Sequence, residues 1–338
     1  MARPNLPKDT RLAYKISRLY YEQAESESAI AERLHLSRAR VSRLLDFSRK
    51  SGIVQITVLS PAGMHPDLED QLEREYDLQE AIVVEADNPQ SQEAVTKSIG
   101  VAAARYLRET LRDGETIGIS WGTTLHAMVT AVQPAYLPHS HVVQIIGGLG
   151  PPTSEVHATD LCRRLASALH CKLTLLPAPV IVGSRPAKEA VLSDPYINHA
   201  LQLIPHLEAA FVGIGAPTPQ AVLLRDGSII SPIELDGLLS RGAVGDIALR
   251  FFDTHGQPIE SELNQRVIGV THAQIKSIPR VVGVAGGPEK FNAIRGALRG
   301  KYLKVLITDH LTAQRLTEEI STPEGFSNPA ETGVVYKE

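Results

Sequence analysis

Three arginines and two serines fall within seven consecutive residues near the start of the chain. The segment supplies Ser37, Arg38, Ala39, Arg40, Ser42 and Arg43. A planar guanidinium can donate to two acceptors of guanine at once, while serine hydroxyls and backbone N–H groups bond phosphate oxygens. These six residues are therefore predicted to contact double-stranded DNA. The alternative is an ordinary solvated basic helix in a three-helix domain, in which the arginines bind nothing.

The elements around this segment have the pattern of a helix-turn-helix. Apolar residues at helical spacing predict a first helix over about residues 10–24. Ser26 is suited to cap a short second helix, and Ser37 to cap a longer third helix. His35 stands in the turn, where glycine is common, and histidine is enriched at positive φ. Ile53–Leu59 alternates apolar and polar residues, which predicts a strand or small wing.

Charge is distributed unevenly along the chain. The 338 residues carry a net charge of −4, with 43% hydrophobic and 21% charged residues. Residues 1–60 hold eleven Lys and Arg against six Asp and Glu, a net charge of +5, which leaves −9 for the remainder. A basic segment joined to an acidic body is typical of a modular DNA-binding protein, because cations must meet phosphates locally. We therefore expect a DNA-binding domain over 1–60 and a second domain over 61–338.

Aliphatic runs alternate with helical patterns in the second domain. Helices are expected over 66–80 and 91–111, and strands at 81–84, 116–119, 142–146, 173–176, 210–214, 281–284 and 304–308. Strands that alternate with helices predict an α/β fold with a mainly parallel, Rossmann-like sheet covered by helices on both faces.

Small residues follow four of these strands. The segments are Ser120–Thr124, Gly147–Gly150, Gly213–Ala216 and Ala285–Lys290. Ligands bind at the carboxyl ends of strands in open α/β sheets, and glycine lets backbone N–H groups approach an anion there. None of the four segments is a dinucleotide fingerprint, and the chain has no GxxxxGK[ST] motif. A crevice for a small ligand is predicted; the alternative is that these glycines serve tight turns and packing alone.

The sequence predicts no membrane span, signal peptide, metal site or cofactor. No apolar run reaches about 18 residues, and the N-terminus lacks the apolar stretch of a signal peptide. The two cysteines, Cys162 and Cys171, match no common zinc spacing. We therefore expect a cytoplasmic protein that holds no metal and no cofactor.

With both halves in view, the chain resembles the SorC family of transcriptional regulators. The matching stretches occur in family order: AIAERLHLSRARVSRLL, GISWGTTLHAM, VVQIIGGLG, LLPAPVIV, FVGIGA, RGAVGDIALRFFDTHG and VGVAGGPEKFNAIRGAL, followed by LITDH. The resemblance implies a winged helix-turn-helix fused to an effector domain related in fold to ribose-5-phosphate isomerase and glucosamine-6-phosphate deaminase. It also implies a homotetramer whose binding to operator DNA responds to a sugar, polyol or sugar phosphate.

The resemblance also implies roles for glycine and threonine residues at the strand ends. Gly122, Thr123 and Thr124 match a loop that in family members holds the phosphate of the effector or its equivalent end. Gly147 and Gly148 match a second wall of the effector site. Helix capping is the alternative role for the two threonines.

Two charged residues are implied to lie beside the effector as well. Asp246 matches an acidic residue that accepts hydrogen bonds from sugar hydroxyls, and Lys290 matches a basic residue near the ligand. One stretch departs from the family, since Gln144, Ile145 and Ile146 stand where some sensors of phosphorylated sugars have an arginine. This departure argues against a doubly phosphorylated effector and leaves a singly phosphorylated sugar or a free polyol.

An enzyme is the alternative function: a sugar-phosphate isomerase or deaminase with an accessory nucleic-acid module. A carboxylate and a lysine can perform general acid/base chemistry, and Asp246 and Lys290 could supply them. That alternative leaves the basic N-terminal segment unexplained. The chain is therefore predicted to be a regulator and not an enzyme.

Overall fold

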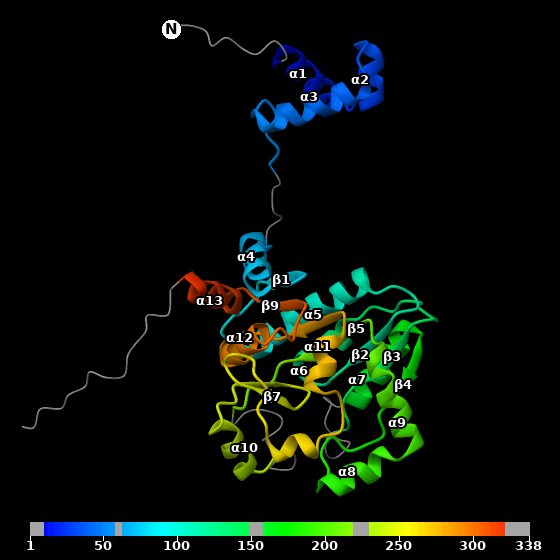
Figure 1. The fold of residues 1–338 in the computed structure, drawn as a ribbon, viewed down its shortest axis with the longest axis vertical. Helices are drawn as coiled ribbons and strands as arrows, with labels where there is room; N and C mark the ends of the chain where they lie inside the picture. Colours follow the sequence, from blue (N-terminus) through cyan, green and yellow to red (C-terminus); the bar gives the residue numbers. More distant parts are fainter. Residues whose placement is uncertain (1–9, 58–62, 149–157, 219–229, 322–338) are drawn as a thin grey trace, which may run out of the picture. The chain divides into compact units, whose positions relative to one another are not determined.

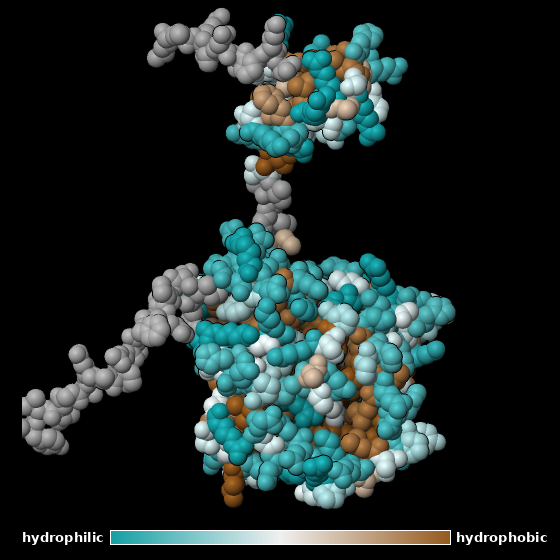
Figure 2. All heavy atoms as spheres, in the orientation of Figure 1, coloured by the Kyte–Doolittle hydropathy of each residue, from teal (hydrophilic) through white to brown (hydrophobic). Residues whose placement is uncertain are grey.

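The chain divides into two compact units, Met1–Pro61 and Ala62–Glu338. The structure is a computed structural model that describes residues 10–57, 63–148, 158–218 and 230–321 (Figure 1). Hydrophilic side chains cover most of the visible face of both units (Figure 2). No helix in the described ranges is long and apolar enough to cross a bilayer, and no three His, Cys, Asp or Glu side chains within them gather as metal ligands would.

The first unit is a set of short helices around an aliphatic core. Its elements are α1 (Thr10–Ser17), the π-helical turn η1 (Arg18–Glu22), α2 (Glu27–Arg33) and α3 (Arg38–Lys50). The Ser26 and Ser37 hydroxyls each accept a backbone N–H of the helix that follows, so both expected N-caps are confirmed. His35 adopts a φ of +52° in the turn between α2 and α3. The expected helix-turn-helix is therefore present.

Two details of this unit differ from the sequence prediction. The single helix expected over 10–24 is divided, because its α-helical turns end at Ser17 and a π-helical turn follows. The strand expected at Ile53–Leu59 is absent from its described part, residues 53–57. A strand needs a partner strand, and the described part of this unit contains none; the Val54 N–H instead bonds the Ser48 carbonyl near the end of α3. The last two residues of the expected strand lie outside the described residues.

The second unit is built on a seven-stranded sheet in which all neighbouring strands are parallel. The strands are β1 (Glu80–Val84), β2 (Thr116–Ile119), β3 (His141–Gln144), β4 (Lys172–Thr174), β5 (Ala209–Gly213), β8 (Arg280–Val284) and β9 (Val305–Asp309). Their order across the sheet is β1-β9-β8-β5-β2-β3-β4. The seven expected strands and the α/β fold class are therefore confirmed, with strand ends shifted by at most two residues.

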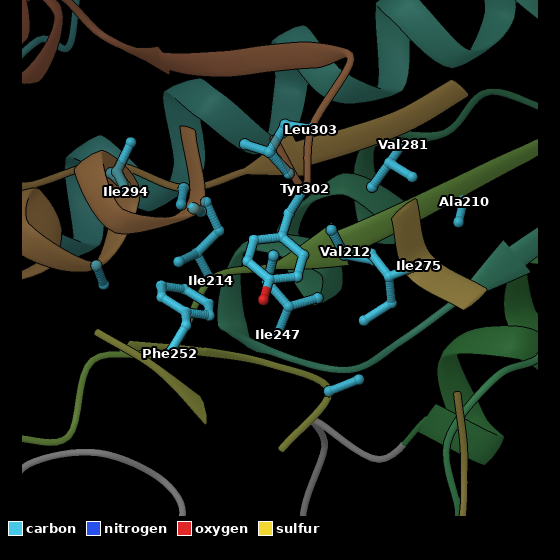
Figure 3. Packing of buried hydrophobic residues seen from close by; sticks show 14 of the residues in the cluster. Ala210, Val212, Ile214, Ile247, Phe252, Ile275, Val281, Ile294, Tyr302 and Leu303 are labelled. Carbon is cyan, nitrogen blue, oxygen red and sulfur yellow. The ribbon is translucent and has the colours of Figure 1, made fainter. Parts of the chain in front are cut away.

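Helices cover both faces of the sheet, because alternate strand residues point to opposite sides. Ala209 and Phe211 of β5 face one layer, and Ala210 and Val212 face the other. The first layer is α5 (Gln92–Thr110), α6 (Thr123–Ala131) and α7 (Ala158–Leu169). The second contains α4 (Pro66–Tyr76), α11 (His272–Ser277), α12 (Phe291–Arg299) and α13 (His310–Ser321). Figure 3 shows Val281, Ile275, Ile294 and Tyr302 packed in this second layer.

The sequence prediction missed an antiparallel hairpin beside the sheet. It consists of β6 (Gly245–Ile247) and β7 (Arg250–Phe252). Its turn residues, Ala248 and Leu249, have φ values of +52° and +59°, and neither is the glycine or asparagine that marks such turns. A bridge between Gly215 and Asp246 joins the hairpin to the segment after β5. The remaining helical elements are α8 (Arg185–Leu192), α9 (Pro195–Gln202), η2 (Ile204–His206), α10 (Pro232–Leu239), η3 (Glu262–Gln265) and η4 (Pro288–Lys290).

Gly118 in β2 has no room for a side chain. A Cβ there would lie 2.7 Å from Ile145 Cγ2 and 2.8 Å from Leu207 Cδ1. We predict that Gly118→Ala lowers the free energy of unfolding by about 1–3 kcal/mol through overpacking. The matched control is Gly183→Ala, where a Cβ would meet nothing within 4 Å, and it should change stability by less than about 0.5 kcal/mol. Urea denaturation of both variants is the measurement, and equal stabilities would contradict the predicted overpacking.

Candidate functional site

The basic residues at the start of α3 share one exposed surface. The exposed set is Ser37, Arg38, Ala39, Arg40, Ser42 and Arg43, while the apolar residues among and after them are buried. Arg38 reaches Glu27 at 3.5 Å but keeps 73% of its side chain exposed. Arg43 Nε donates to the Ala39 carbonyl at 3.3 Å. Exposed contacts of this kind stabilise little, so both guanidinium groups can turn to an external partner.

The carboxyl ends of four adjacent parallel strands meet at one edge of the sheet. β3, β2, β5 and β8 are neighbours in that order and run in the same direction. The hairpin adds Asp246 to this edge through its bridge to Gly215, just after β5. The edge therefore brings together the segments that carry the seven residues expected at the effector site: Gly122, Thr123, Thr124, Gly147, Gly148, Asp246 and Lys290.

Asp246 is a buried carboxylate with one unused oxygen. The residue is only 4% exposed; its Oδ2 accepts the Leu249 N–H at 3.0 Å, while Oδ1 has no partner in the described structure. A Cβ at Gly215 would collide with Oδ1, so this close approach requires glycine. Burial raises the pKa of Asp246 to about 6, and the Leu249 N–H and the Lys290 ammonium oppose the shift. The free oxygen can accept a hydrogen bond from a ligand hydroxyl.

Lys290 brings a positive charge to the same edge. The residue ends the short turn η4 and is half-buried. Burial lowers the pKa of Lys290, whereas the neighbouring charges of Asp246 and Glu289 raise it. An ammonium and a carboxylate that interact from separate segments suit a ligand with hydroxyl groups and an anionic group.

Two more buried groups without partners follow β2. Thr124 is 2% exposed and its Oγ1 has no hydrogen-bond partner in the described structure, and neither has the buried Nε1 of Trp121. Between them, Gly122 has a φ of +140°, which favours glycine. Thr123 is exposed in the first turn of α6, where the helix dipole favours negative charge. Sequence reasoning missed Trp121, although it is the only tryptophan of the chain and directly precedes Gly122.

The N–H groups of Gly147 and Gly148 are not free to bind an anion, although the glycine-rich sequence had suggested that they were. The Gly147 N–H donates to the Ile268 carbonyl at 3.1 Å, and the Gly148 N–H donates to the Ala178 carbonyl at 2.8 Å. A Cβ on Gly147 would lie 2.7 Å from the carbonyl oxygens of Ala178 and Pro179. Glycine is therefore needed at position 147 for close packing of backbone on backbone, and the pair has no free amide to donate to an anion.

Known proteins match nearly the whole chain. Residues 61–318 match the Sugar-bind family, whose model describes a sugar-binding domain. The chain is 35% identical over 310 residues to the Deoxyribonucleoside regulator of Bacillus subtilis, with 92% of this chain and 98% of the relative covered. It is 30% identical over 314 residues to the Sorbitol operon regulator of Klebsiella pneumoniae, with 91% and 98% covered. The crystal structure of the full-length Klebsiella pneumoniae sorbitol operon regulator SorC matches with a TM-score of 0.70 at 29% identity, covering 92% of this chain and 100% of that chain.

The raised pKa of Asp246 makes stability depend on pH. The ordinary pKa of Asp is 3.8, whereas burial raises the pKa of Asp246 in the folded protein to about 6. Between these values the folded state binds more protons than the unfolded state, so the free energy of unfolding falls as pH rises. The loss from this one group is at most about 3 kcal/mol at pH 7. We predict that Asp246→Asn, which keeps an acceptor for the Leu249 N–H, removes this loss.

Urea denaturation at about pH 4 and pH 7 measures the effect, because the two pH values bracket the titration. The wild type should lose more stability over this range than Asp246→Asn. The control is Asp70→Asn, which removes an exposed carboxylate of α4 and should keep the wild-type pH dependence. An identical pH dependence in the wild type and Asp246→Asn would show that the fold does not disfavour the ionised carboxylate.

Proposed function

Because the chain belongs to the SorC family of transcriptional regulators, we propose that residues 1–60 bind operator DNA and that residues 61–338 bind a sugar, polyol or sugar phosphate that controls this binding. One observation carries the second half of the proposal. Trp121 Nε1, Thr124 Oγ1 and Asp246 Oδ1 are buried without hydrogen-bond partners among the described residues, in segments at the same edge of the sheet. A buried polar atom without a partner is costly, so a ligand that bonds these atoms gains affinity.

The chemistry of these atoms suits a polyhydroxyl compound. Asp246 Oδ1 accepts from a hydroxyl, Trp121 Nε1 donates to an oxygen, and the Thr124 hydroxyl can do either. Lys290 and the N-terminus of α6, which begins at Thr123, provide positive potential for one anionic group. These residues, with Gly122 and the packed wall at Gly147 and Gly148, form the proposed effector site.

Gln144 supports a ligand with at most one phosphate. It occupies the stretch where some family members have an arginine, and it is buried. Its Nε2 donates to the Ile146 carbonyl at 2.7 Å, and its Oε1 accepts the Thr159 hydroxyl at 3.2 Å. Both ends of this amide are thus used within the protein, so it adds neither a charge nor a free donor for a second phosphate.

Two relatives are named for deoxyribonucleosides and for sorbitol. We propose that the effector of this chain lies in the same chemical range: a pentose, a hexitol or one of their monophosphates. For DNA, we propose the exposed α3 surface as the contact set: Ser37, Arg38, Ala39, Arg40, Ser42 and Arg43. The net charge of +5 over residues 1–60 supports attraction to phosphates.

We further propose that the protein acts in the cytoplasm as a homotetramer, as its family resemblance implies, and that it is not an enzyme. Asp246 and Lys290 have the groups for acid/base chemistry, so the alternative is testable. Incubation with ribose 5-phosphate and with glucosamine 6-phosphate separates the two functions. Turnover would favour the enzyme, whereas ligand-dependent change in DNA binding without turnover would favour the regulator.

Fluorescence of the single tryptophan, Trp121, reports on the proposed effector site without a label. We predict that a panel of deoxyribose 5-phosphate, ribose 5-phosphate, sorbitol and sorbitol 6-phosphate contains a compound that changes this emission and raises Tm. Lys290→Ala and Asp246→Ala should abolish the response and leave DNA binding unchanged. The control Lys97→Ala removes an exposed ammonium of α5 and should respond normally. A full response in both site variants would put the effector elsewhere.

Arg43 is predicted to contact a base. Arg43→Ala should weaken binding to specific DNA by about 1–3 kcal/mol, because a base contact is lost together with a charge. The DNA is obtained by selecting duplexes with the wild-type protein, and affinity is measured by fluorescence anisotropy at fixed salt. Arg49→Ala makes the same charge change in the last turn of α3, where Arg49 lies 3.8 Å from Asp46, and should lose less. Equal losses in the two variants would contradict a base contact by Arg43.

A further inference from the structure

We propose that Asp309 and the stacked rings of His65 and His310 couple the effector loop to α4, the helix that follows residues 58–62. The effector loop is Gly286–Phe291, which follows β8 and contains Lys290. This inference rests on the proposed function, because it describes how ligand binding at that site affects α4, the first helix of the second unit. Asp309, His65 and His310 are positioning residues in this account, since they act on the loop and on α4 and not on the ligand.

Asp309 holds the effector loop in place through a buried hydrogen bond. It ends β9 and is 1% exposed. Its Oδ2 accepts the Gly287 N–H at 2.8 Å and the Thr312 hydroxyl at 2.7 Å, and its Oδ1 accepts the Thr312 N–H at 3.0 Å. A Cβ at Gly286 would collide with Oδ2, so the loop lies directly against this carboxylate. A displacement of the loop must therefore break buried, charge-assisted hydrogen bonds or move Asp309 with it.

His310 follows Asp309 and carries the contact to the start of α4. The rings of His310 and His65 are stacked, with centroids 5.6 Å apart and planes at 11°. His65 is the residue directly before α4. His65 Nε2 and His310 Nδ1 are buried, and neither has a hydrogen-bond partner in the described structure. The contact between the two rings thus depends on packing. Because these nitrogens have no hydrogen bond to break in the described structure, the rings are easier to separate than a hydrogen-bonded pair.

The rest of α4 is attached to the same group of elements. β1 is an edge strand beside β9, and its outward N–H groups at Ala81 and Val83 donate to the carboxylates of Glu73 and Glu69, each at 2.9 Å. Leu72 of α4 is fully buried. Figure 1 shows α4 beside β1 and α13. A shift at Asp309 therefore acts on α4 through its first residues, while the edge-strand bonds hold the remainder of the helix in place.

An effector can use this connection only by favouring one arrangement of the loop over another. A ligand that bonds Lys290 stabilises the loop position that Asp309 holds, and so also stabilises the stacked state of His65 and His310. Linkage is reciprocal: disrupting the stack must loosen the loop by the same free energy. This reciprocity allows a test in the protein without any ligand.

The test is amide hydrogen exchange, followed by mass spectrometry on the full-length chain without ligand. His65→Ala should speed exchange in the effector loop by about two- to thirtyfold, the range expected for coupled sites. His65→Phe keeps a ring for stacking and should exchange like the wild type. His139→Ala removes an exposed histidine ring far along the chain and is the control for loss of a histidine.

Thr312→Val tests the same connection in the opposite direction. It removes the hydroxyl that bonds Asp309 and Gly287, so exchange should rise in the loop and also in α4. The matched control is Thr317→Val on the same helix, where the hydroxyl donates to the Gln314 carbonyl, and the loop should not change. Unchanged exchange in β5 shows that each effect is local and not global unfolding.

The proposal is overturned if His65→Ala leaves loop exchange at the wild-type rate, or if Thr312→Val loosens the loop alone. Because no ligand is used, this outcome is independent of the Trp121 titration. A responsive titration with no exchange coupling would reject only the connection to α4. Exchange coupling without any responding compound would reject only the proposed effector class.

Discussion

Parallel pairing of β3, β2, β5 and β8 is the constraint on which the second unit depends. Parallel strands cannot be joined by tight turns, so the chain must cross over between them, and all four strands end at the same edge. Residues far apart in the sequence, such as Trp121 and Lys290, are carried to that edge by their strands. The hairpin that holds Asp246 is added there by a bridge to Gly215. The chemistry of the edge is therefore a product of topology.

The glycine amides at this edge are bonded within the protein, so side chains and the N-terminus of α6 are the groups that the proposed effector site can offer. The N–H groups of Gly147 and Gly148 are bonded to carbonyls, and the Gly287 N–H is bonded to Asp309. Glycine at positions 147 and 287 permits close packing, while Trp121 and Asp246 have buried polar atoms without partners among the described residues. A site built in this way can change its ligand by changing a few side chains on an unchanged frame, which fits relatives named for compounds as different as deoxyribonucleosides and sorbitol.

Sequence patterns predicted the parts of the fold that are determined locally. Buried parallel strands are continuous aliphatic runs, so all seven appear in the sequence, and Ser26 and Ser37 identify two helix starts. The β6–β7 hairpin was missed because its strands are three residues long and its turn lacks the usual residues. The expected strand after α3 was wrong over residues 53–57 because alternation alone cannot supply a partner strand.

The proposed effector site was only partly predictable from the sequence. Small residues after strands indicated the edge, but Asp246 and Lys290 were assigned through a family resemblance and not by spacing. Whether a buried atom lacks a partner depends on contacts between distant segments, so the sequence placed Trp121 beside Gly122 but could not show that its indole N–H is unpaired among the described residues. For the same reason, the sequence could not show whether the Gly147 N–H is free for a ligand. That N–H donates to the carbonyl of Ile268, which lies more than a hundred residues away in sequence.

The carboxylates on α4 also have a consequence for solubility. An edge strand exposes amide groups that can recruit a strand from another molecule, and Glu69 and Glu73 occupy those of β1. Glu80 on the same strand has a raised pKa because of burial and the nearby charges of Glu73 and Glu69, so the cover concentrates negative charge where a second chain would approach. A fragment that began after Tyr76 would lack α4, so the N–H groups of the edge strand β1 would be exposed and could pair with a strand of another molecule. The first helix of the second unit, α4, thus also covers amide groups through which the sheets of neighbouring copies could pair.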